Sequence, residues 1–346
     1  MQKDFHYYAT AVLARAAGFG EEDALTIAYA AQYVDDATNG ETILVAGQEF
    51  EPKFTANDTL HHILDRTKQA SHRKVYIPFH FLPQGDNPDQ AWGLLTVKGS
   101  VSRLAREMMA AAETEPRADL RLCRLGLSLH VLADTWAHQG FSGRWHREND
   151  LKGVDWELFS DPEWMEDKGR LVNWAHEMLG HTEVGPLADY GFATWDARLE
   201  LPRPAGATIQ RDNPAEHLEA SREIFSLLCR FPHPKAHDPS DWAEIEPGVK
   251  SCIGNVGFLP ARCRQWRNAF AALFPATHFR DYDITQWEEE ALGRPLVRRR
   301  IIDLILPQDR PSYPGSADFT QSKWALFHQA AGMHRDLVRN ALGWPA

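Results

Sequence analysis

The sequence predicts an all-α fold: a multi-helix bundle with short β pieces, forming one main domain over residues 1–346. Long stretches place apolar residues at helical spacing, whereas stretches that alternate apolar and polar residues are nearly absent. A proline-containing stretch at 201–213 is typical of a linker. We therefore expect a core over about residues 1–200 and a helical C-terminal extension over about residues 208–346.

The predicted helices are amphipathic or rich in helix-forming residues, and glycine or proline bounds several of them. In the first part of the chain they cover residues 4–17, 21–35, 59–70, 91–112, 117–139 and 170–181. In the second part they cover residues 214–231, 259–274 and 319–342. Residues 41–57 differ, because the apolar run after Thr42 and the following Gly47 predict a short strand or hairpin.

The composition of the chain is that of a globular protein and argues against some partners. The net charge of −11 disfavours nonspecific binding to nucleic acid or anionic membranes, because Lys and Arg supply that affinity. No apolar run approaches the roughly 20 residues that span a bilayer, and the N-terminus lacks the apolar core of a signal peptide. We expect a cytoplasmic protein, and export without a cleaved signal stays open. None of the four cysteines forms a Cys-x-x-Cys pair, which argues against a thiolate zinc site.

The helix over residues 117–139 carries the clearest candidate site. His130, Asp134 and His138 follow one another at steps of four, so they fall within a stripe roughly 80° wide on one helical face. Imidazole and carboxylate groups are common ligands of zinc, and Asp134 is placed to bridge two ions. The alternative is a polar stripe on a surface helix. The rest of the helix is apolar, which indicates that the stripe points inward, where such groups need partners or a metal.

Four further candidates lie near the ends of the first two helices. Asp4 and His6 begin the first helix, and Asp35 and Asp36 end the second. Two carboxylates at a helix C-terminus oppose the helix dipole, so a cation such as a metal would stabilise them there. For Asp36 we favour a solvated turn, and Asp4 also suits a helix cap or an acceptor that orients a histidine. We expect residues 1–6 to be buried rather than frayed.

Three more histidines are candidate ligands. His80 lies between two phenylalanines and two prolines, a rigid setting in which it either binds a specific partner or donates to a backbone carbonyl. His176 and His181 are five residues apart, one too many for the His-Glu-x-x-His metalloprotease motif, so we reject that motif but keep both as ligand candidates. A turn after Gly185 is expected to bring Asp189 near them.

The order of these candidates resembles the zinc-dependent phospholipase C and single-strand-specific nuclease superfamily. The pattern of that superfamily has an early His, an Asp after a helix, a loop His, a His-x-x-x-Asp followed by a further His, and a late His-x-x-x-Asp/Glu. The residues that match in type and order are His6, Asp35, His80, His130, Asp134 and His138. The resemblance covers roughly the first 200 residues and implies a helical bundle of the phospholipase C type with three zinc ions, in a bacterial branch of the superfamily.

Two departures from the superfamily pattern bear on the number of metals. The known enzymes use the amine and carbonyl of a processed N-terminal Trp as ligands, whereas this chain starts at Met1, so Asp4 is expected to substitute. The late acidic residue is missing, because glycine stands at its position after both His176 and His181. We therefore expect one to three Zn²⁺ ions, or another divalent metal, per chain.

The resemblance implies that a metal-activated water attacks phosphorus while Asp35 orients or deprotonates that water. The prediction is a metal-dependent hydrolase, first of all a phosphoesterase with a small-molecule or phosphate-ester substrate and no stable nucleic-acid complex. Two alternatives stay open: a metal-dependent enzyme with a non-phosphate substrate, and a non-catalytic helical protein that binds metal.

Overall fold

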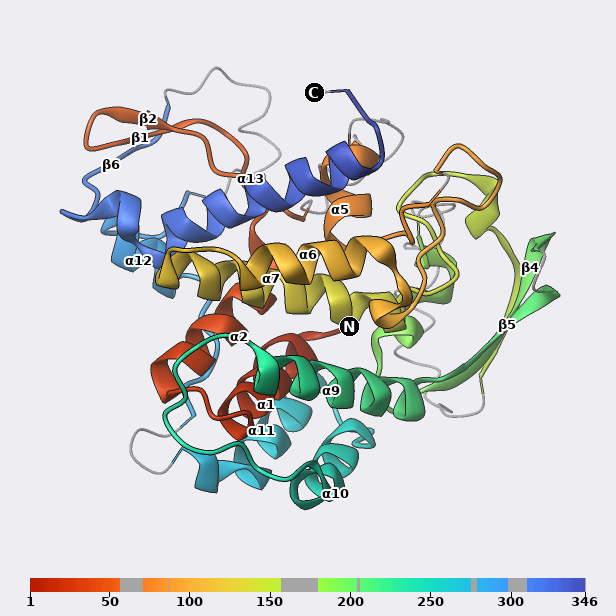
Figure 1. Cartoon of the computed structure of the whole chain (residues 1–346). Helices are drawn as coiled ribbons and strands as arrows, with labels where there is room; N and C mark the ends of the chain where they lie inside the picture. The colour runs from red at the N-terminus through yellow and green to blue at the C-terminus, as the bar shows by residue number, and fades with distance from the viewer. Residues whose placement is uncertain are drawn as a thin grey trace.

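The computed structural model describes residues 1–56, 71–86, 88–156, 180–203, 206–274, 279–297 and 310–345. In these ranges the chain is mostly helical and has two small sheets (Figure 1). Its α-helices are α1 (Thr10–Ala16), α2 (Glu21–Asp36), α5 (Ile77–Phe79), α6 (Arg103–Glu113), α7 (Ala118–Ala137), α9 (Asn213–Arg230), α10 (Trp242–Ile253), α11 (Leu259–Ala269), α12 (Gln286–Leu292) and α13 (Lys323–Ala341). None of these helices is long and apolar enough to cross a membrane.

Helix α7 lies at the centre of the bundle and contacts α2, α6, α9 and α13 (Figure 1). The helix suits this place because its leucines, Ala133, Ala137 and Trp136 are all buried. Gly126 allows α2 to approach closely, since a Cβ atom at that position would collide with the backbone of Ile27. The close approach brings Asp35 of α2 to 3.7 Å from His130 of α7.

The N-terminus is packed inside the molecule, at the position marked N in Figure 1. Met1, Phe5 and His6 are at most 5% exposed and residues 2–4 are partly buried, so the start of the chain is packed rather than frayed, as predicted, but only three of its first six residues are fully buried. Residues 4–9 form a π-helical turn, Asp4–Ala9, that leads into α1. The Asp4 side chain caps no helix, so the capping role considered for it is wrong.

The first sheet confirms the hairpin expected over residues 41–57. Strand β1 (Ile43–Val45) pairs antiparallel with β2 (Gln48–Phe50) and parallel with the distant β6 (Ser312–Tyr313). The tight turn between β1 and β2 has positive φ at Ala46 (48°) and Gly47 (79°), the geometry that suits the twist of a two-residue hairpin.

The second sheet corrects the linker expected at 201–213. Strand β4 (Thr194–Arg203) pairs antiparallel with both β3 (Leu151–Trp156) and β5 (Gly206–Asp212). Its signal in the sequence is an alternation in which Trp195, Ala197 and Leu199 are buried and the residues between them are exposed. Pro202 is accommodated because the pairing of β4 with β5 is irregular between residues 198 and 203.

Most predicted helices are present, with shifted ends. The helix expected over 91–112 begins only at Arg103, because the Ser102 hydroxyl accepts a hydrogen bond from the backbone of Ala105 and caps α6 there. Helix α10 was not predicted, and Pro247 inside it explains why. The helix expected at 59–70 and residues 170–179 of another lie outside the described residues.

The main hydrophobic core draws on both ends of the chain. It contains N-terminal residues such as Phe5 and Val12 together with Trp266, Trp287 and Trp324 from the C-terminal part. The proposed extension therefore packs into the same core as the N-terminal helices. A second, smaller core lies under the β3–β4–β5 sheet.

Candidate metal centre

The centre is built on the buried end of α7. His130 and Asp134 are 0% and 1% exposed, so the stripe faces inward, as its apolar surroundings predicted. His130 Nε2 lies 3.2 Å from Asp134 Oδ2. His138 follows directly after the last residue of α7 and is also buried, with its Nδ1 3.7 Å from the same carboxylate oxygen.

The two oxygens of Asp134 face different partners. Oδ1 lies 2.6 Å from the amine of Met1 and 3.1 Å from His6 Nε2. Oδ2 lies 3.3 Å from His80 Nδ1 and faces His130. Burial raises the pKa of Asp134, but the Met1 amine, His138, His130 and His6 outweigh burial and hold that pKa well below its usual range. The carboxylate is thus placed to bridge two cations.

The N-terminal amine lies between two carboxylates. It is 2.6 Å from Asp134 and 3.0 Å from Asp189 Oδ1, and it is fully buried. Burial favours the neutral amine, but the two carboxylates outweigh burial and raise the pKa of the Met1 amine from 8 to about 11. Asp189 lies at the end of a short 3₁₀ segment, Thr182–Asp189, in the turn that was expected to bring it near the histidines.

His6 lies deep in the centre, where its Nδ1 has no hydrogen-bond partner among the described residues and its Nε2 lies 3.1 Å from Asp134 Oδ1. Its ring stacks on His130 with 3.9 Å between the centroids. Burial, followed by the nearby His130 and Met1 amine, holds the pKa of His6 well below its ordinary value of 6.5. A buried imidazole nitrogen without a hydrogen bond is costly, which points to a partner of another kind, such as a metal ion.

Three histidines are oriented by backbone carbonyls. His80 Nε2 donates to the Thr55 carbonyl at 3.0 Å, His138 Nδ1 to the His80 carbonyl at 2.6 Å, and His181 Nδ1 to the Gly185 carbonyl at 3.2 Å. Because a carbonyl oxygen only accepts, each of these nitrogens carries the proton. The second nitrogen of each ring then faces a carboxylate oxygen.

In His138 and His181 the second ring nitrogen faces an oxygen of Asp189, and each such pair of atoms needs a proton or a metal ion between them. His138 Nε2 is 3.0 Å from Asp189 Oδ1, and His181 Nε2 is 3.7 Å from Asp189 Oδ2. In a neutral imidazole the nitrogen opposite the donor is an acceptor, so two acceptors meet here unless a proton or a metal lies between them. Burial, which outweighs Asp189, lowers the pKa of His181 to about 4 and so disfavours the proton on that ring. This arrangement is the usual one for metal-binding histidines.

In the described residues the ligand-type atoms form three groups, in each of which the atoms lie within 4.8 Å of one another. The groups are His6, His130 and Asp134; Asp35, His80 and His130; and His138, His181 and Asp189. His130 belongs to two groups, and Asp134 contacts residues of all three. The structure therefore brings together His6, Asp35, His80, His130, Asp134, His138 and His181.

Two candidates lie elsewhere. The Asp4 carboxylate pairs with Arg262 at 2.7 Å and does not reach the centre, so the expected substitution for an N-terminal ligand is wrong: the Met1 amine itself occupies that place. Asp36 accepts hydrogen bonds from Tyr282 at 2.8 Å and Gln32 at 3.0 Å. His176 lies outside the described residues.

Asp35 is the most exposed carboxylate of the centre, because its side chain is 34% exposed against 2% for Asp134. Gln32 donates to Asp36 and lies 3.5 Å from Asp35, which links these carboxylates to an open cleft of about 640 Å³. The residues that line the cleft are Lys3, Gln32, Asp36, Leu259, Tyr282, Asp283 and Ile284. Its volume lies in the range typical of small-molecule sites.

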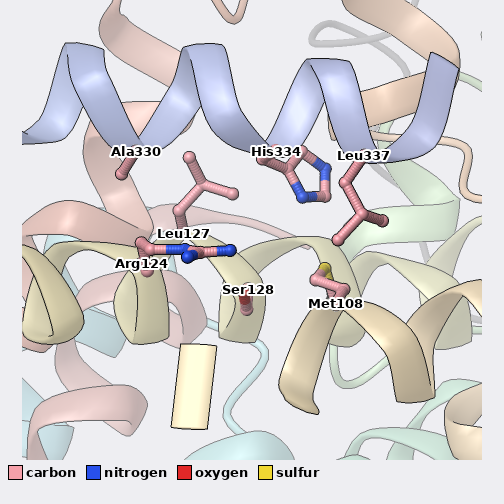
Figure 2. A pocket seen from close by; sticks show the side chains of 7 residues that line it. All are labelled: Met108, Arg124, Leu127, Ser128, Ala330, His334 and Leu337. Carbon is pink, nitrogen blue, oxygen red and sulfur yellow. The ribbon is translucent and has the colours of Figure 1, made fainter. Parts of the chain in front are cut away.

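A second cavity lies between α6, α7 and α13 (Figure 2). Its volume of about 10 Å³ leaves room for a single water and excludes a substrate. One of its lining residues, His334, donates from Nε2 to the Pro78 carbonyl at 2.7 Å. That bond ties α13 to the segment that carries His80.

The sequence family described as "Family of unknown function (DUF6765)" matches residues 1–342 of the chain. No curated protein and no solved structure matches this chain. The resemblance to the phospholipase C and nuclease superfamily therefore stays a prediction. The function proposed below rests on the geometry of the metal centre.

Proposed function

Because the chain belongs to the DUF6765 family, whose description assigns no function, we propose its function from the metal centre: a zinc-dependent hydrolase that cleaves phosphate esters. The observation that supports this most strongly is the orientation of His80, His138 and His181. Each donates one ring proton to a carbonyl and turns its other nitrogen toward a carboxylate. Hydrogen bonding of this kind fixes the tautomer that binds a metal.

The donor set suits zinc. Imidazole nitrogen and carboxylate oxygen are ordinary zinc ligands, and His6 is buried beside Asp134 with an unpartnered ring nitrogen that an ion would satisfy. One ion would be held by His6 and Asp134, with the Met1 amine as a further ligand once it gives up the proton that its two carboxylate partners favour. A second would be held by Asp35, His80 and His130, and a third by His138, His181 and Asp189. The residues of this set that match the superfamily pattern do so in type and order.

When bound, zinc supplies a Lewis acid that polarises phosphoryl oxygens and makes water a nucleophile near neutral pH. The chain itself supplies orientation and the exclusion of bulk water. Asp35 is the most exposed carboxylate of the three groups, so it is placed to hold or accept a proton from the attacking water. Gln32, 3.5 Å away, restrains that carboxylate.

The cleft lined by Gln32 and Asp36, which neighbour Asp35, is where the organic part of a substrate would lie. Lys3 provides a positive charge for a phosphate oxygen, and Leu259 and Ile284 provide apolar surface. A volume of about 640 Å³ is more than a lone phosphate requires, which favours a phosphodiester with an organic group.

The test combines metal analysis with hydrolysis of bis-p-nitrophenyl phosphate. We expect two or three zinc ions per chain and zinc-dependent hydrolysis that Asp35→Asn reduces by about 100-fold or more, the scale of a lost general base. Asp336→Asn is the control, because Asp336 is exposed on α13 and far from the centre in sequence. Zinc binding without hydrolysis would leave the non-catalytic or non-phosphate alternatives, and absence of zinc would refute the proposal.

A further inference from the structure

A buried arginine of the C-terminal part holds the first residues of the chain. Arg262 on α11 is 3% exposed. Its Nε donates to Asp4 Oδ2 at 2.7 Å, its Nη2 donates to the Gln2 side chain, and its Nη1 donates to the Gly257 carbonyl at 2.9 Å. The planar fork of the guanidinium allows these three directions at once, which a lysine does not.

The same guanidinium lies against the turn that carries Asp189. Its central carbon is 5.3 Å from the ring centroid of Tyr190 and 5.4 Å from that of Phe192, within the distance of a cation–π contact. Those two rings are stacked on each other, 5.0 Å apart. Arg262 therefore contacts Gln2, which follows Met1, and Tyr190, which follows Asp189. The Met1 amine and the Asp189 carboxylate lie 3.0 Å apart in the centre.

We propose that Arg262 is a positioning residue that sets the Met1 amine against Asp134 and Asp189 and thereby completes the N-terminal part of the metal centre. The inference rests on the proposed function in that it takes these groups to bind zinc. Gln2 follows Met1 directly, and Asp4 lies two residues before His6. Because Arg262 binds both Gln2 and Asp4, it fixes where the Met1 amine and the His6 ring lie. Without it, the terminus is free to leave the centre, as chain ends usually do.

The first experiment measures the terminus without metal. Acetylation of the Met1 amine by acetic anhydride, followed by mass spectrometry of EDTA-treated protein, reports how often the terminus leaves the centre. We expect Arg262→Gln to raise the labelling rate by about tenfold or more, as local opening exposes a buried segment. Arg267→Gln is the matched control: it lies on the same helix and forms an arginine–aspartate pair of the same 2.7 Å length with Asp281, but it is partly exposed. An unchanged rate in Arg262→Gln would overturn the proposal.

The second experiment measures zinc affinity and stoichiometry at fixed pH. We expect Arg262→Gln to weaken the N-terminal zinc by about 10- to 100-fold, the usual effect of losing a group that orients ligands. The ion held by Asp35, His80 and His130 should remain. Arg262→Lys keeps the charge but not the fork, and we expect an intermediate loss. Wild-type affinity in both variants would refute the positioning role, whereas a wild-type protein without zinc would refute the proposed function as well.

A double-variant cycle separates positioning from general stabilisation. If Arg262 acts through the N-terminal segment, Asp4→Asn lowers zinc affinity by itself, and the double variant binds zinc no more weakly than Arg262→Gln alone. Additive losses would show that Arg262 acts by another route and would overturn the proposal. If Arg262→Gln fails to fold, Asp4→Asn removes the same ion pair from its less buried partner. A loss of zinc affinity in Asp4→Asn that Arg267→Gln does not show then supports the proposal, and equal affinity in the two variants overturns it.

Discussion

Replacing Asp134 by asparagine is expected to remove both metal and stability. The substitution keeps the size of the side chain and deletes its charge. In the folded protein Asp134 is ionised, since the Met1 amine and three histidines outweigh burial and keep its pKa well below the usual range. The variant leaves the buried amine with Asp189 as its remaining carboxylate partner among the described residues, 3.0 Å away.

The size of the effect follows from burial. Removing one partner of a buried ion pair costs about 3–5 kcal/mol, and the Asp134 side chain is 2% exposed. Unfolding entropy of roughly 2 cal/mol/K per residue gives about 0.7 kcal/mol/K for 346 residues. The melting temperature of the metal-free variant should therefore fall by about 4–7 °C.

Thermal unfolding monitored with and without zinc is the assay. Zinc that binds the folded state raises the melting temperature of the wild type, and the variant should lose most of that rise. Asp336→Asn, which removes an exposed carboxylate on α13, controls for the loss of one negative charge. An Asp134→Asn protein with wild-type melting temperature and wild-type zinc content would refute the reasoning.

Three further predictions concern other parts of the chain. A Gly-Ser extension directly before Met1 turns the buried amine into an amide, so zinc content measured by mass spectrometry should fall by about one ion per chain; full content would contradict the placement of the amine. Burial lowers the pKa of His328 from 6.5 to about 3, so its neutral form stabilises the protein fully above pH 6.5, and that stability is lost as the pH falls from 6.5 toward 3. In urea unfolding, His328→Gln should reduce the loss of free energy between pH 7.5 and pH 5 by about 2 kcal/mol, and an unaltered pH dependence would exclude this. Gly126→Ala should destabilise by about 1–3 kcal/mol and weaken zinc binding, because its methyl group forces α2 away from α7; equal stability would mean that the helices adjust.

Local sequence patterns predicted the parts of the centre that lie on one element. The four-residue spacing placed His130 and Asp134 on one face, and the apolar remainder of α7 indicated that this face is buried. The rigid Phe- and Pro-rich segment pointed to a specific partner for His80, and the structure gives that ring both a carbonyl and a carboxylate.

The pairing of distant groups was beyond the reach of local patterns. Asp4 suited a ligand or a cap, but its partner is Arg262, which lies 258 positions away in sequence. The Met1 amine has no side-chain signature at all, so its role depends on tertiary packing alone. Strand β4 was missed for a different reason, since prolines and a charged alternation in that stretch are equally typical of a loop.

The position of the Met1 amine also bears on the order of folding. Its carboxylate partner Asp134 is 133 positions away, and the Gln2–Arg262 contact spans 260 positions. Contacts of such high sequence separation form late, because the closure entropy of long loops opposes them. At about 5–20 residues per second, a ribosome needs on the order of 13–50 s to extend the chain to Arg262. The contacts that Arg262 makes with Gln2 and Asp4 can therefore form only after three quarters of this chain exists.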